Sequence, residues 1–173
     1  SAEEDLKKAI INAEFYVDGE HIEIKSGDAK SKLDQAMEYL VTHVYSELSL
    51  ITKNAETDED ILAVLRGDHL SGVMAGMEAN HDAAVNMEEY LEMQDTKKLP
   101  TSMADVQSRY QGIPYGWKEI DIAAVMAQLI YNQKVTVKYA GTTIQPGDKK
   151  LPDMLRKKSE VGKTIVSKRI NIA

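Results

Sequence analysis

The sequence of 173 residues contains no cysteine, one tryptophan and one phenylalanine. The absence of cysteine excludes disulfide bonds, thiolate catalysis and cysteine-ligated zinc. It also permits a reducing compartment, and we expect a cytoplasmic protein. No apolar run approaches the roughly 20 residues that span a bilayer, and no basic segment leads into an apolar one near the N-terminus. We therefore expect neither a membrane partner nor a secretory signal.

The overall composition is that of an ordinary globular protein. Hydrophobic residues make up 43% of the chain and charged residues 28%, a balance typical of a soluble globular protein and not of a disordered or membrane chain. This length is sufficient for one domain, or two small ones, with a buried core. The chain begins with Ser1-Ala2 instead of methionine, as chains do after cleavage of an affinity tag, so we expect a segment of a longer protein.

The charges are unevenly distributed, although the net charge is only −7 at pH 7. Residues 1–133 carry 11 basic and 25 acidic side chains, whereas residues 134–173 carry 10 basic and 3 acidic ones. A basic tail on an acidic body can attract a polyanion such as DNA, or it can dock against acidic surface of the same or a neighbouring protein. We favour the second interpretation.

The N-terminal half shows a change from helical to strand periodicity and back. Residues 3–13 have the spacing of a short helix, and Asp18-Gly19 is a strong signal for a two-residue hairpin turn. In that hairpin we expect Phe15 opposite Ile22 and Val17 opposite Glu20. Residues 28–51 predict one long amphipathic helix with an apolar stripe formed by Leu33, Met37, Leu40, Val41, Val44, Leu48 and Ile51.

Two further helices are indicated before the middle of the chain. One has Thr57 and Asp60 at capping-box spacing and Gly67 as its stop, and the other covers residues 81–95. The intervening glycine- and methionine-containing stretch has no clean period. We therefore place a domain boundary there, with a hairpin-plus-helix part over residues 1–78 and a second part over residues 79–173.

The second part has the element order of a winged helix. Ser102 and Asp105 can cap a helix that ends near Tyr110, and a second helix is predicted over residues 118–132. Strands at 134–139 and 142–144 form a ribbon around Ala140-Gly141, followed by a basic helix near 151–160 and a strand within 163–172. The expected fold class is α+β, mostly helical, with a winged-helix-like C-terminal part and a basic tail.

No local motif indicates catalysis or ligand binding. The segment VGKTI at 161–165 resembles the end of a phosphate-binding loop, but Lys157 occupies the position where that loop needs its first glycine. Residues 54–65 lack the glycine and the glutamate of a calcium loop, and the four histidines are not paired at helical metal-site spacing. We expect no catalytic residue, no cofactor and no metal, and so not an enzyme.

The predicted recognition helix, KEIDIAAVMAQLIYN at 118–132, is poorly suited to DNA. Two of its first three polar residues, Glu119 and Asp121, are acidic, and apolar side chains cover most of its circumference. Tyr115 and Trp117, just before it, are candidate structural anchors. The candidate contacts for DNA or a protein partner lie on the ribbon and tail: Lys134, Lys138, Arg156, Lys157 and Lys158.

The stretch PYGWKEIDIAAVMAQLIYNQKVTVKYAGTTI, residues 114–144, resembles part of the large P-loop ATPase of bacterial BREX phage-defence systems (BrxC/PglY type). EFYVDGEHIEIKSGDAKSKLDQAMEYLVTHVYSEL, residues 14–48, is similar to a stretch that precedes it in those proteins. The resemblance covers most of residues 13–170 and implies a fragment of a multidomain ATPase that works in a complex near DNA. The family's nucleotide-binding motif has no counterpart here, so no catalytic residue carries over.

Together, these patterns predict a non-catalytic interaction and coupling module from a larger phage-defence ATPase. Its expected partners are other domains of the parent protein and other defence-system proteins. The alternative is a winged-helix module that binds DNA through its ribbon and basic tail.

Overall fold

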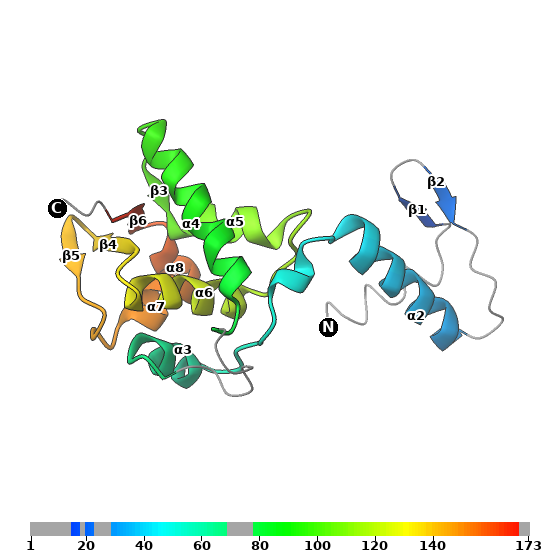
Figure 1. Ribbon diagram of the computed structural model, residues 1–173, viewed down its shortest axis with the longest axis horizontal. Coiled ribbons are helices and arrows are strands. Elements are labelled where there is room, and N and C mark those ends of the chain that lie inside the picture. The colour runs from blue at the N-terminus through cyan, green and yellow to red at the C-terminus, as the bar shows by residue number, and fades with distance from the viewer. Residues whose placement is uncertain (1–14, 18–19, 23–28, 69–77, 170–173) are drawn as a thin grey trace. The chain divides into compact units, whose positions relative to one another are not determined.

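The computed structural model describes residues 15–17, 20–22, 29–68 and 78–169 (Figure 1). The contacts divide the chain into two compact units, Ser1–Leu48 and Ser49–Ala173. The helix expected at residues 3–13 and the turn at Asp18-Gly19 lie outside the described residues.

The first unit contains the predicted hairpin. Strands β1 (Phe15–Val17) and β2 (Glu20–Ile22) are antiparallel, and Phe15 lies opposite Ile22 while Val17 lies opposite Glu20. The expected register is therefore confirmed. It follows from the two-residue spacing between the strands, because a one-residue slip would move every side chain to the other face.

The single helix predicted over residues 28–51 is wrong in its second half. Helix α2 (Ala29–Tyr39) gives way to a π-helical turn, η1 (Leu40–Val44), and then to a 3-10 turn, η2 (Leu48–Leu50). At the junction, the Thr42 hydroxyl donates to the carbonyls of Glu38 at 3.0 Å and Tyr39 at 3.3 Å. Such side-chain bonds compete with the backbone ladder of a regular helix. The predicted stripe also differs, because Met37 and Val41 are exposed.

The second unit begins with helices whose ends follow the predicted signals. They are α3 (Asp58–Leu65), α4 (His81–Thr96), α5 (Met103–Gln111) and α6 (Glu119–Tyr131). At the start of α5, Ser102 and Asp105 form the expected reciprocal cap, with bonds of 3.0 and 3.2 Å. Gly67 follows α3 with φ +88°, a conformation that glycine adopts without strain.

Four antiparallel strands form one sheet in the order β3-β6-β4-β5. They are β3 (Thr101–Ser102), β4 (Val135–Tyr139), β5 (Thr142–Ile144) and β6 (Thr164–Lys168). The β4–β5 ribbon confirms the prediction, and Ala140 and Gly141 both have the positive φ that a tight hairpin turn needs. The predicted C-terminal strand is present as β6. Its place between β3 and β4, which completes the sheet, was not predicted.

The connection from β5 to β6 carries two short helices. The basic helix expected near 151–160 is divided into α7 (Leu151–Arg156) and α8 (Lys158–Val161), because Lys157 between them has an extended backbone. Within the described residues, no helix is long and apolar enough to cross a membrane.

Helix α6 lies at the centre of the second unit, between α3 and α4 in Figure 1. Helices α3, α4, α5 and α7 and strand β4 all pack against it, and its residues 121–127 are each at most 2% exposed. Helix α3 contributes the buried side chains Ile61 and Leu65 to this core. The compact unit defined by the contacts begins at Ser49, whereas the sequence placed a domain boundary after residue 78.

Candidate functional site

The turn between α5 and α6 is fixed by aromatic stacking. Trp117 donates its backbone N–H to the carbonyl of Tyr110 at 2.8 Å, and their rings stack at 4.4 Å with an interplanar angle of 10°. Tyr115 packs against both rings. The structure thus places both anchor residues named from the sequence, Tyr115 and Trp117, in the core at 8% and 2% exposure.

An arginine lies over this aromatic cluster. The Arg109 guanidinium is 4.3 Å from the centre of the Tyr90 ring, and it donates to the Tyr115 hydroxyl at 3.5 Å. The Tyr110 hydroxyl donates to Asn86 at 2.8 Å, and burial raises the pKa of Tyr110 above its ordinary value. Sequence analysis missed Arg109 and Tyr90, because residues on two different helices carry no local signal of their pairing.

The polar side chains of α6 have intramolecular partners. Near its start, the buried Asp121 carboxylate accepts bonds from the Asn54 side chain at 2.6 Å and the backbone N–H of Ala55 at 2.8 Å. Gln128, two turns further along, donates to Glu78 at 3.0 Å. A DNA-reading helix would need such groups for base edges and phosphates. Here they are committed to the protein itself.

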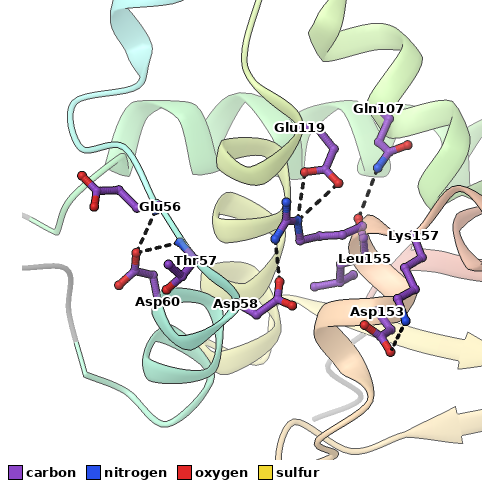
Figure 2. A network of polar contacts seen from close by, with 10 residues as sticks. Glu56, Thr57, Asp58, Asp60, Gln107, Glu119, Asp153, Leu155 and Lys157 are labelled. Atoms are coloured by element: carbon purple, nitrogen blue, oxygen red, sulfur yellow. Dashed lines mark hydrogen bonds and ion pairs between the residues drawn. The ribbon is translucent and has the colours of Figure 1, made fainter.

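The remaining acidic residue of α6, Glu119, forms an ion pair with Arg156, which also pairs with Asp58. Figure 2 shows the Glu119 and Asp58 carboxylates on either side of the same guanidinium group. The Arg156 Nε atom lies 2.9 Å from Glu119, and its Nη1 atom lies 2.6 Å from Asp58 at the start of α3. A planar guanidinium can hold two carboxylates in this fixed geometry. One side chain therefore connects α3, α6 and α7.

The five candidate contact residues from the sequence differ in whether their charges are already paired with acidic side chains of this chain. Arg156 is held by the two carboxylates just described, and Lys157 pairs with Asp153 at 3.1 Å. Lys134, Lys138 and Lys158 are exposed and form no ion pair with any described residue. Lys138 lies in β4 and Lys158 in α8, so the basic tail is distributed over several elements.

The segment that resembled a phosphate-binding loop runs from a helix into a strand. Gly162 ends α8, and the buried Thr164 begins β6, with its hydroxyl donating to the Glu160 carbonyl at 2.9 Å. A phosphate-binding loop instead runs from a strand into a helix N-terminus. Among the described residues, no group of three histidine, aspartate or glutamate side chains is placed to hold a metal ion.

The second unit contains a helix–turn–helix followed by an antiparallel sheet with the β4–β5 ribbon. This order of elements defines a winged-helix domain, and here the recognition helix is covered by neighbouring helices. The chain belongs to the family of the BREX ATP-binding protein BrxC. Residues 47–170 match the model of the BrxC winged helix-turn-helix domain. Residues 1–40 match that of the BrxC fourth domain with a six-stranded beta sheet. No solved structure matches the chain.

These matches confirm the resemblance predicted from PYGW and the helix and ribbon that follow. The matched regions are two domains of an ATP-binding defence protein, and neither is its P-loop ATPase domain.

Proposed function

We propose that residues 49–173 act as a non-catalytic interaction and coupling module of a BREX defence ATPase. The partners would be other domains of BrxC and other proteins of the defence system. The observation that carries this proposal is the burial of α6, because the helix that would read DNA is covered by α3, α4, α5, α7 and β4.

The cost of uncovering α6 supports the proposal. To enter a major groove, α6 would have to lose α3, which would expose the buried side chains Ile61 and Leu65. Exposing one such side chain costs about 1.5–3 kcal/mol. The Arg156 network and the bonds of Asp121 would break as well. A few phosphate contacts at the acidic start of α6 would not offset these losses.

The coupling role is supported by the way the chain enters the unit. The buried side chain of Asn80, next to the start of α4, accepts bonds from the backbone N–H groups of Thr52 at 2.8 Å and Lys53 at 2.9 Å. Asp121 of α6 holds the next two residues, Asn54 and Ala55. A displacement of the entering segment would therefore be transmitted directly to α4 and α6.

The rival function is DNA binding by the ribbon and the basic tail, favoured by the exposed Lys134, Lys138 and Lys158. The logarithm of affinity falls by about 0.9 per neutralised phosphate for each tenfold rise in salt. With Arg156 and Lys157 paired to acids, these three lysines would give a shallow salt dependence and weak binding.

Fluorescence anisotropy with a labelled duplex of about 20 base pairs, titrated between roughly 50 and 200 mM salt, tests the choice. We expect no micromolar binding, and no difference between the wild type and the double variant Lys134→Glu/Lys138→Glu. Micromolar binding that weakens steeply with salt and is lost in the double variant would overturn the proposal and establish the rival.

A further inference from the structure

A slot opens beside the first half of β4, and we call it the β4 slot. It has a volume of about 220 Å³, and its described lining includes apolar Ile130, Val135, Ile144 and Pro146, with Gln145 and Arg169 as polar members. Strand β6 pairs with β4 from Val135 onward, whereas β5 pairs with it only from Val137 onward. Residues 135–136 therefore have a neighbouring strand on one side and the slot on the other.

The slot results from the sequence that follows β5. If the ribbon continued in register, Gln145 would lie opposite Thr136 and Pro146 opposite Val135. Proline has no backbone N–H to donate and ends the pairing, so the chain leaves the edge of β4 at this point. The gap gives access to the buried side chains of Val135 and Ile130, which are only 5% and 3% exposed.

The one charged residue among the described residues that line the slot is basic. Arg169 is an exposed lining residue whose guanidinium donates to the side-chain carbonyl of the neutral Gln133 at 3.5 Å. The exposed Lys134 is bonded to Arg169 through their backbones at 2.8 Å, and it forms no ion pair with a described residue. No acidic residue is among the described residues that line the slot. An apolar site with a cationic rim is complementary to a segment that carries both aliphatic and acidic side chains.

We propose that the β4 slot binds an extended segment of a partner protein in which apolar and acidic residues alternate. The segment lies along residues 135–136 of β4, on the side where no described strand pairs with them. It places an aliphatic side chain against Val135, Ile144 and Pro146, and gives a carboxylate to Arg169. Addition of a strand to an exposed sheet edge is a recurring mode of peptide recognition, in which backbone bonds supply affinity and pockets for alternate side chains supply specificity. This inference rests on the proposed interaction function, because it names the kind of partner that the module takes.

The test uses the full 173-residue chain and a fluorescein-labelled peptide of about ten residues in which leucine and valine alternate with glutamate. A second peptide with lysine in place of each glutamate is the control ligand. We expect saturable anisotropy binding of the acidic peptide only, with chemical-shift changes at the backbone amides of residues 135–137 and 143–145.

Two variants probe the two halves of the slot. Arg169→Glu reverses the rim charge, and Ile144→Thr removes apolar wall while keeping a β-branched side chain. Each should weaken peptide binding about fivefold or more. Lys163→Glu is the matched control, because it makes the same change of charge before β6, at the opposite end of that strand from Arg169, and it should leave the peptide affinity unchanged.

The inference would be overturned by the absence of saturable binding, by equal binding of the lysine peptide, or by equal weakening by Lys163→Glu. Sedimentation that shows self-association, abolished by Ile144→Thr, without peptide binding would make a second copy the occupant and would also overturn it. These results are independent of the duplex titration. Absence of both DNA and peptide binding removes only the slot inference, whereas steep DNA binding removes the proposed function itself.

Discussion

At the scale of single residues, two buried polar side chains connect the segment that enters the second unit to α4 and α6. Asp121 is 1% exposed and Asn80 is 2% exposed, and each bonds to the segment that leads into α3. Hydrogen-bonded polar groups in a core contribute little net stability, but they are costly to leave without a partner. The sequence did not indicate this role for either residue. Asp121, for example, bonds to residues more than 60 positions away.

Replacement of this carboxylate gives a residue-scale prediction. Asp121→Ala leaves the buried N–H of Ala55 without its acceptor, and we expect the free energy of unfolding to fall by about 2–3 kcal/mol. Urea denaturation followed by the fluorescence of the single tryptophan, Trp117, measures the change. The control is Glu89→Ala on the exposed face of α4, which should stay within about 0.5 kcal/mol of wild type. Equal effects of the two substitutions would contradict the buried role of Asp121.

At the scale of elements, Arg156 fixes α7 to both α3 and α6. Its side chain is 29% exposed, and its two carboxylate partners, Asp58 and Glu119, are 53% and 31% exposed. Ion pairs at this exposure contribute at most about 1 kcal/mol each. Their effect is therefore local, on the docking of α3, and not on the stability of the whole unit.

Hydrogen exchange can detect such a local effect. In Arg156→Ala we expect faster amide exchange in the last turn of α3, at residues 62–65, with little change in α4 and a loss of global stability of about 2 kcal/mol or less for the two pairs together. Lys157→Ala is the matched control, because the adjacent lysine is 62% exposed and, among the described residues, pairs within its own segment with Asp153. Unchanged exchange of α3 in Arg156→Ala would show that the network does not hold this helix.

At the scale of the whole molecule, the chain combines two regions that match separate domains of one family. Along the sequence, the boundary between the two compact units lies between Leu48 and Ser49, close to the start of the winged-helix match at residue 47. The boundary expected after residue 78 would separate α3 from α6. The two divisions therefore make different predictions about which segment folds independently.

A protein comprising residues 49–173 should unfold cooperatively in urea, with the helical circular dichroism and the Trp117 emission changing together. One comprising residues 79–173 lacks buried Ile61 and Leu65 and should be less stable by several kcal/mol, at about 1.5–3 kcal/mol for each lost side chain. Equal stability of the two proteins would support the boundary at residue 78 instead.

The sequence alone determined the local elements and one global constraint. Periodicity, caps and turn residues predicted the hairpin register, the ends of α5 and the β4–β5 ribbon, because the interactions that specify them lie within a few residues. The apolar circumference of α6 likewise required that protein cover this helix. The irregular end of the helix after Tyr39 escaped prediction, since its apolar spacing continues past the point where Thr42 competes for the backbone.

Only the tertiary structure decided which elements meet. It brought Asp58 to Arg156, placed β6 between β3 and β4, and opened the slot where Pro146 leaves the edge of β4. The physical reason is that a residue pattern specifies which face must be buried or paired, but many segments satisfy the same pattern. The choice among them depends on how all the buried surfaces of the chain fit together at once.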